Sequence, residues 1–321
     1  MTMKALRTAM LAGGGGGAKL AAGMNRTQSV ADGLVVTNVG DDFEHTGLLI
    51  CPDTDSVLYA LAGCIDPKKG WGRANESWRV HETLGELGAP QWFQLGDQDI
   101  ALHLRRLALL KEGLSLTEVT QYLATAMNIE GVTVCPASDQ TVRTQLDTNA
   151  GRLDFQTYFV AQRCSPHVNA IKFAIDTNAK PSAAIADFVN SGIDCLIIAP
   201  SNPILSIAPI LAVPGMGDLL QQSRCTVAMS PIVDGMALKG PLAKLMEEFA
   251  LEVSAVGWCR YMQDIYPGSI DYWVFDKRDR CREVELRALV PKPLFLDSII
   301  TGPAHAGALI DQVIAEVVSY V

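Results

Sequence analysis

Five consecutive glycines, Gly13, Gly14, Gly15, Gly16 and Gly17, are the first candidate for chemistry in the chain. They follow an apolar run and precede a helical pattern that contains Lys19. Glycine lets the backbone approach a ligand closely, and the first N–H groups of a helix attract anions. These residues predict a site for nucleotide phosphates. A P-loop is excluded because its GK[ST] sequence is absent, and a flexible glycine turn without a ligand is the alternative.

Carboxylates are concentrated after the second apolar run. Asp41 and Asp42 follow residues 34–39 after a single glycine, and Asp53 and Asp55 open the next predicted helix. Mg²⁺ is commonly held by one or two such carboxylates together with substrate phosphates. The pattern therefore predicts a Mg²⁺ site. The alternative is that Asp53 or Asp55 only caps the helix that begins near residue 56.

Two later apolar runs also end in polar loops. Ser201 and Asn202 stand beside prolines directly after residues 194–199, and Lys239 closes the loop that follows residues 226–230. Proline fixes the backbone of such a loop, and the side chains offer hydrogen bonds and one cation. These residues are candidates for binding the nucleotide. For Lys239, a solvated surface lysine is the alternative.

The elements that must position these loops alternate along the chain. Short apolar runs predict strands at 6–12, 34–39, 132–135, 194–199, 226–230 and 272–275. Helices are predicted at 18–25, 56–62, 100–111, 116–128, 183–191, 242–248 and 306–318. This alternation predicts an α/β, Rossmann-like fold with a mostly parallel sheet and helices on both faces. Ligands of such sheets bind at the carboxyl ends of the strands, so the polar loops should converge there.

Composition limits the class of protein. The 321 residues are 49% hydrophobic and 19% charged, which excludes disordered and coiled-coil classes. We expect a single domain over residues 1–321, with a helical excursion at about 65–128 capping the site. A net charge of −9 without a long basic run argues against nucleic acid or a membrane as a partner. The sequence offers neither a signal-peptide pattern nor an apolar run long enough for a membrane span, so we expect a cytoplasmic protein.

Eight motifs in a fixed order carry a family resemblance. They are Gly13–Gly17 with Ala18-Lys19-Leu20, Asn38-Val39-Gly40-Asp41-Asp42, Cys51-Pro52-Asp53-Thr54-Asp55, Gly70-Trp71-Gly72, Leu95-Gly96-Asp97-Gln98-Asp99, Phe155-Gln156, Pro200-Ser201-Asn202-Pro203 and Ser230-Pro231-Ile232. On these motifs the chain resembles the 2-phospho-L-lactate transferase family (CofD/FbiA), which takes part in the biosynthesis of the deazaflavin coenzyme F420.

The resemblance implies a specific reaction. The terminal ribityl hydroxyl of a 5-deazariboflavin precursor, called Fo, attacks the phosphorus nearer the lactate in a guanosine diphosphate-linked donor. Mg²⁺ is the cofactor and GMP leaves. Such phosphoryl transfer requires positioning and charge neutralisation more than a covalent nucleophile. Relatives form homodimers, so the resemblance also implies a homodimer.

The resemblance also implies roles for individual residues. Asp55 corresponds to an aspartate that binds Fo near the attacking hydroxyl, and Gln94 and Trp71 are further candidates for binding Fo. Asp41 is the first choice for the metal, and Asp55 either shares the metal or orients the hydroxyl. The glycine run, Lys19, Ser201, Asn202 and Lys239 would hold the guanosine diphosphate.

The chain departs from the family pattern at three places. Gly15 stands where relatives usually have Thr or Ser, and Gln94 stands where they commonly have Lys or Arg. The third departure is Ser138-Asp139-Gln140, where the usual motif is Ser-Asp-Asp. These departures leave open which three-carbon acid is transferred, because related enzymes use phosphoenolpyruvyl or 3-phosphoglyceryl donors in place of phospholactyl.

Two other functions are weighed against the transferase. A non-enzymatic nucleotide-sugar-binding regulator of the same superfamily would share the glycine run, but its second strand is typically followed by an Asp-Asp-Gly-Gly-Ser-like loop. This chain has Asp41-Asp42-Phe43-Glu44-His45 instead. A nicotinamide-dependent dehydrogenase is suggested by the glycines alone, and no recognisable catalytic His or Tyr-Lys pair supports it.

Overall fold

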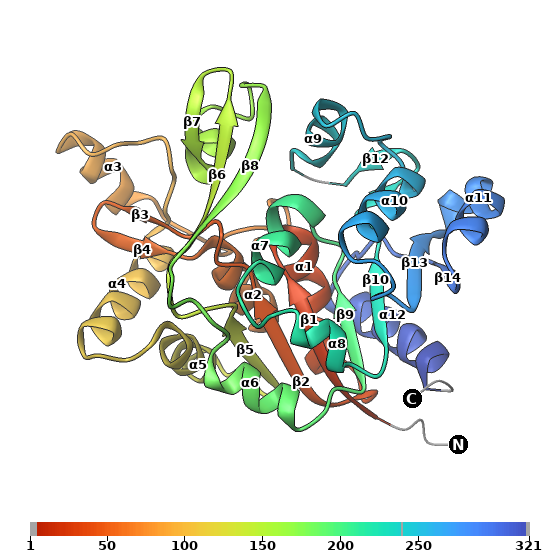
Figure 1. Ribbon diagram of the computed structural model, residues 1–321. Helices are drawn as coiled ribbons and strands as arrows, with labels where there is room; N and C mark the ends of the chain where they lie inside the picture. Colours follow the sequence, from red (N-terminus) through yellow and green to blue (C-terminus); the bar gives the residue numbers. More distant parts are fainter. Residues whose placement is uncertain (1–4, 239, 319–321) are drawn as a thin grey trace.

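A seven-stranded parallel sheet forms the centre of the computed structural model, which describes residues 5–238 and 240–318 (Figure 1). The strand order is β14-β13-β10-β9-β1-β2-β5, and all neighbouring pairs are parallel. The bounds are β1 Leu6–Ala12, β2 Val30–Thr37, β5 Val132–Pro136, β9 Cys195–Ile198, β10 Thr226–Met229, β13 Tyr272–Asp276 and β14 Pro293–Leu296. The predicted α/β, Rossmann-like fold is confirmed. The sequence analysis missed β14.

Helices cover both faces of this sheet because the strands are apolar on both sides. In β1, Met10 belongs to one hydrophobic cluster, whereas Ala9 and Leu11 belong to the other. Successive side chains of a strand point to opposite faces, so each face needs its own apolar layer. The Met10 face packs against α1 (Gly14–Ala21), α2 (Pro52–Leu61), α4 (Asp97–Lys111), α5 (Leu116–Ala126) and α12 (Pro303–Val317). The opposite face packs against α6 (Ala183–Asn190), α7 (Ala208–Leu211), α8 (Asp218–Gln222), α9 (Leu242–Glu248), α10 (Ala255–Ile265) and α11 (Glu283–Leu289).

The region expected to cap the site at about 65–128 has two different parts. Leu109 of α4 and Val119 of α5 are buried in the cluster on the Met10 face, so these helices belong to the layer over the sheet. Helix α3 (Arg79–Glu86) contributes no buried residue. Within the described residues, α3 and the loops beside it are therefore the peripheral part of this region. A single domain with a capping excursion stays a prediction.

A small antiparallel sheet that the sequence analysis missed stands over the main sheet. It consists of β6 (Val142–Thr148), β7 (Gly151–Asp154) and β8 (Val168–Ile175), in the order β7-β6-β8. Figure 1 shows it at the top of the molecule, next to the ends of the central strands. The Thr144 N–H donates to the Gly40 carbonyl over 2.8 Å, which ties the small sheet to the loop after β2.

Two hairpins and several short helical turns complete the chain. The hairpins are β3 (Phe43–His45) with β4 (Leu48–Ile50), and β11 (Ile232–Val233) with β12 (Met236–Ala237). The short turns are η1 (Met24–Arg26), η2 (Thr157–Ala161), η3 (Pro203–Ile207) and η4 (Lys277–Arg282). In the ranges that the structure describes, no helix is long and apolar enough to cross a membrane.

Candidate active site

Helix α1 begins inside the glycine run. Gly13 is its N-cap residue and the helix covers Gly14–Ala21, whereas the sequence analysis predicted a glycine loop and a helix that starts at residue 18. The first N–H groups of a helix have no partner within the helix. The glycines therefore form the first helical turn after β1, and this turn presents N–H groups at the carboxyl ends of the strands.

Close packing accounts for two of these glycines. A Cβ atom at Gly16 would lie 2.1 Å from the carbonyl oxygen of Pro200, and one at Gly17 would lie 2.7 Å from Ser201 Oγ. Gly14 has a φ of +61°, in the left-handed region that favours glycine. Gly16 and Gly17 are thus required by the packing of α1 against the loop after β9, whether or not a ligand binds there.

We predict that Gly16→Ala destabilises the protein. The neighbour of the added methyl group is a backbone carbonyl, which cannot rotate away as a side chain can, so the loop after β9 must move. Overpacking of this kind costs about 1–3 kcal/mol or more of unfolding free energy. Urea denaturation measures the change. Gly217→Ala is the matched control, because Gly217 has a φ of −57° and nothing lies within 4 Å of its Cβ position. Equal stabilities of the two variants would contradict the packing argument.

Asp53 binds the start of α1. Its Oδ1 accepts a hydrogen bond from the Gly14 N–H over 2.7 Å, and its Oδ2 accepts one from Asn38 Nδ2 over 2.9 Å. The alternative that it caps its own helix is wrong, because α2 has Cys51 as its N-cap residue and no side-chain cap bond. Burial raises the pKa of Asp53 to about 6, and the bonds from Asn38 and Gly14 oppose this shift. One of the free N–H groups of α1 is therefore already occupied by a carboxylate.

Asp41 and Asp42 are buried in the loop after β2. They are 5% and 2% exposed, and Oδ1 of each has no hydrogen-bond partner within the described ranges. Burial and the nearby charge of Asp53 raise the pKa of Asp41 well above its usual range. Burial raises the pKa of Asp42 to about 7, and the Arg143 guanidinium partly offsets this shift. The loop thus holds two carboxyl groups, each with one buried oxygen that no described residue satisfies.

These orphaned oxygens fit a divalent cation. Among residues 5–238 and 240–318, no group of three or more His, Cys, Asp or Glu side chains is arranged to hold a metal ion. Mg²⁺ usually takes one or two carboxylates and completes its shell with water and substrate phosphates. Asp41 and Asp42 are suited to this kind of site, because a cation there would stabilise the charged carboxylates that burial disfavours.

Asp55 forms a buried ion pair with Arg106 of α4. Arg106 donates from Nη2 to Asp55 Oδ1 and from Nη1 to Asp55 Oδ2, and it is 1% exposed. Arg106 Nη1 also donates to the Leu49 carbonyl and to His103 Nδ1, the latter over 2.9 Å. Burial lowers the pKa of His103 to about 4, so the ring is neutral near pH 7 and can accept this bond. Both oxygens of Asp55 are therefore held in fixed positions.

The loop after β9 uses its polar side chains to fix the backbone. Ser201 Oγ donates to the Gly13 carbonyl over 2.7 Å and accepts from the Gly13 N–H. Asn202 Oδ1 accepts from the backbone N–H groups of Ile204 and Leu205. The structure thus brings Ser201 to the first turn of α1, as expected for a nucleotide site, and gives both side chains structural partners.

Lys19 is the one predicted lysine that the structure describes, and it does not join this cluster. Lys19 lies in the last turn of α1, at the opposite end of the helix from the glycine N–H groups. Lys239 lies outside the described residues. The described site is therefore rich in carboxylates and poor in cations.

The two other predicted Fo-binding residues lie on loops near α4. Trp71 is 49% exposed, and Lys69 Nζ lies 5.0 Å from the centre of its ring. Gln94 is exposed and follows Phe93, which packs edge-on against Phe43 of β3 at 4.8 Å between ring centres. The structure gives neither Trp71 nor Gln94 a contact with Asp41 or Asp55.

Sequence reasoning missed Arg143 and the specific pairing of Arg106. Arg143 lies on β6, which was not predicted, and its Nη1 donates to the carbonyl of Val142 over 2.8 Å and to that of Val39 over 3.5 Å. Arg106 pairs with Asp55, which is 51 positions away, and the local sequence gives no signal for this pairing. The alternation of side chains along β6, with a period of two residues, was the signal that could have revealed this strand and with it Arg143.

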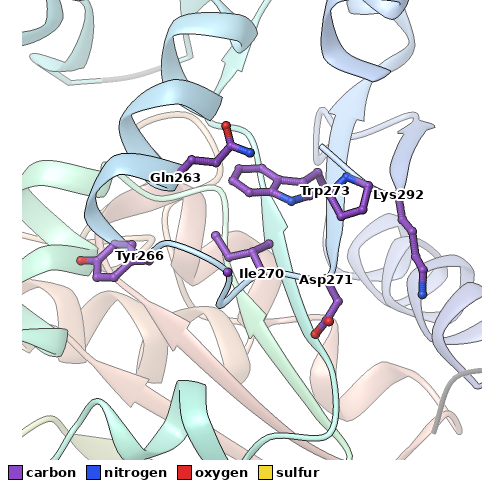
Figure 2. A pocket seen from close by; sticks show the side chains of 8 residues that line it. Gln263, Tyr266, Ile270, Asp271, Trp273 and Lys292 are labelled. Atoms are coloured by element: carbon purple, nitrogen blue, oxygen red, sulfur yellow. The ribbon is translucent and has the colours of Figure 1, made fainter. Parts of the chain in front are cut away.

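A separate cavity of about 270 Å³ lies at the other edge of the main sheet (Figure 2). It is lined by Asp271 just before β13, Trp273 near the start of β13 and Lys292 just before β14. The polar loops lie after the carboxyl ends of the strands, whereas this cavity is at the amino ends. It is therefore distinct from the candidate active site.

Comparisons with known proteins agree with this architecture. The family model described as 2-phospho-L-lactate transferase CofD matches residues 8–290. The chain is therefore a member of the CofD family, which is a family of transferases. A solved structure of a UPF0052 family protein from Bacillus halodurans covers 98% of this chain and is itself covered to 99%, with a TM-score of 0.64 and 16% identity. That likeness concerns the fold alone.

Two groups of relatives carry different names. A protein from Methanosarcina acetivorans named 2-phospho-L-lactate transferase is 36% identical, with 95% of this chain and 97% of the relative covered. A protein from Streptomyces griseus named phosphoenolpyruvate transferase is 35% identical, with 88% and 92% covered. Both relatives are named transferases, so the chain is an enzyme of this class. Because the two identities are nearly equal, they do not distinguish between the two acids in these names.

Proposed function

We propose that the protein transfers a phospholactyl-type group from a guanosine diphosphate-linked donor to Fo. The group is 2-phospho-L-lactate or its phosphoenolpyruvyl or 3-phosphoglyceryl equivalent. The ribityl hydroxyl of Fo forms a bond to the phosphorus nearer the three-carbon acid, and its proton is released to the solvent. The bond from this phosphorus to the bridging oxygen breaks, and GMP leaves with that oxygen. The product is coenzyme F420-0 or its analogue.

The observation that carries the proposal is the pair of orphaned carboxylates beside the first turn of α1. Asp41 and Asp42 each have one buried oxygen without a hydrogen-bond partner in the described structure. Asp53, whose charge acts on Asp41, accepts a hydrogen bond from the Gly14 N–H, so these carboxylates lie close to the first turn of α1. A diphosphate group needs N–H donors and a divalent cation, and this arrangement offers both. In the proposal, the glycine run together with Ser201, Asn202 and Lys239 forms the donor site. Lys19, at the far end of α1, would act only through its charge.

Asp41 is proposed as the first ligand of Mg²⁺. The cation would neutralise phosphate charge as the bond between phosphorus and the bridging oxygen breaks. Asp55 either shares the ion or orients the ribityl hydroxyl. Its two bonds with Arg106 favour the orienting role, because both of its oxygens already have a cationic partner and are fixed in position. Trp71 and Gln94 are proposed to contact the deazaflavin ring.

The experiment that tests the proposal is a transfer assay that detects GMP. Purified protein, Fo, Mg²⁺ and guanosine diphosphate-linked lactate are expected to give GMP and a new phosphodiester of Fo. Chelation of Mg²⁺ is expected to stop GMP release, and added Mg²⁺ to restore it. Release of GMP at the same rate without Fo would mean hydrolysis and would contradict transfer.

A further inference from the structure

Arg143 is a half-buried arginine at the edge of the candidate active site. It lies on β6, and its Nη1 donates to the carbonyl of Val39, which comes just before the Gly40-Asp41-Asp42 loop. The next residue, Thr144, donates its N–H to the Gly40 carbonyl over 2.8 Å. Two neighbouring residues of β6 thus hold the guanidinium beside the loop that carries Asp41 and Asp42.

The guanidinium of Arg143 has donors to spare. Its two hydrogen bonds are both from Nη1 to backbone carbonyls, and it forms no ion pair within the described part of the chain. Arg106, the other arginine of the site, is buried and already forms an ion pair with Asp55 and hydrogen bonds with Leu49 and His103. An arginine has five N–H donors, and its planar fork matches a carboxylate in a bidentate arrangement. Of these two arginines, Arg143 is the one that is half-buried, has no ion pair in the described structure and retains donors for an anionic ligand.

The position of Arg143 along the sheet indicates which anion it meets. The carboxyl ends of β9, β1 and β2 lie in this order, about 4.8 Å apart from strand to strand. Ser201 follows β9, the first turn of α1 follows β1, and the Arg143 contact follows β2. The proposed donor has its parts in the order nucleoside, diphosphate and three-carbon acid. With the diphosphate at the first turn of α1, the acid reaches the end of β2.

We propose that Arg143 binds the carboxylate of the transferred three-carbon acid and so selects donors that carry one. This inference rests on the proposed function, because it assigns one end of the proposed donor. It also addresses the charge of the site, since Asp41, Asp42 and Asp53 are buried without an ion pair within the described residues and the proposed donor is itself anionic. Arg143 would supply the compensating positive charge at the acid end.

Calorimetric binding of two donors tests this role. The first is guanosine diphosphate-linked lactate, and the second is the matching ethyl ester of guanosine diphosphate, which lacks only the carboxylate. The wild-type protein is expected to bind the lactate donor about 10- to 100-fold more tightly, the size of a charge-assisted hydrogen bond. In Arg143→Gln the two affinities become nearly equal, and Arg143→Lys keeps part of the preference.

Arg152→Gln is the matched control, because Arg152 lies in the same small sheet and pairs with Asp147 at its surface. It should retain the full preference, and melting curves should show that all variants are folded. An unchanged preference in Arg143→Gln, or equal weakening of both donors, would overturn the role of Arg143. If the wild-type protein bound guanosine diphosphate but did not prefer the lactate donor, the same conclusion would hold. If it bound none of these compounds, the proposed function itself would fail.

Discussion

Asp41→Asn is expected to lower kcat/KM for transfer by at least about 100-fold, the scale seen when one preorganised electrostatic contact to a transition state is lost. The amide has almost the same shape but offers a neutral oxygen in place of a carboxylate. The variant should therefore need more Mg²⁺ for half-maximal rate. Initial rates of GMP release across a Mg²⁺ titration measure both effects.

Stability should change in the opposite direction. Burial and the nearby Asp53 raise the pKa of Asp41, so its charged form is disfavoured in the folded protein. A neutral side chain removes this penalty, and Asp41→Asn should melt at the same temperature as the wild type or higher. Asp218→Asn, at an exposed position of α8 on the other face of the sheet, is the control and should leave turnover unchanged. Near-normal turnover by Asp41→Asn would refute its role at the metal.

Arg106→Met is expected to give the largest loss of stability, about 3–5 kcal/mol of unfolding free energy. The substitution leaves the Asp55 carboxylate buried without its cation, and Asp55 is only 4% exposed. Urea denaturation measures the loss. Arg105→Met is the matched control on the same helix, because Arg105 pairs with Glu112 at the surface and such pairs contribute about 1 kcal/mol or less.

A double variant separates the buried charge from lost packing. Arg106→Met combined with Asp55→Asn removes both charges, so it should recover much of the stability that Arg106→Met loses. If the double variant were as unstable as the sum of the two single variants, the ion pair would not be the cause.

The same ion pair makes Asp55→Asn alone an ambiguous test of catalysis, because it leaves the Arg106 guanidinium buried without a counter-ion. Asp41, whose Oδ1 has no partner in the described structure, is the cleaner position.

The main sheet was predictable because its strands are almost wholly apolar. β9 (Cys195–Ile198) and β10 (Thr226–Met229) are buried along their whole length, and runs of this kind are typical of parallel strands covered on both faces. β6 was not predicted, although its residues alternate between buried and half-exposed. Its buried positions include Thr144 and Thr148, so the apolar half of the alternation is weak in the sequence.

The site was predictable where it depends on strand ends and not where it depends on distant partners. Parallel strands bring their carboxyl ends to one edge, so the meeting of Gly13, Asp41 and Ser201 follows from strand order. The roles of the individual aspartates do not follow from strand order. Asp53 and Asp55 are two positions apart, yet one binds the start of α1 and the other binds Arg106 of α4. Tertiary packing decides between these partners, and local sequence carries no signal for it.

The most direct test of the transferase assignment is a transfer assay with a panel of donors. Protein, Fo and Mg²⁺ are incubated with guanosine diphosphate linked to lactate, to enolpyruvate or to glycerate, and GMP and the Fo phosphodiester are quantified by chromatography. We expect GMP and the diester in equal amounts with at least one donor, and the preferred donor identifies the transferred acid. Absence of GMP release with all three, from protein shown to be folded, would contradict the transferase assignment and favour a nucleotide-binding regulator.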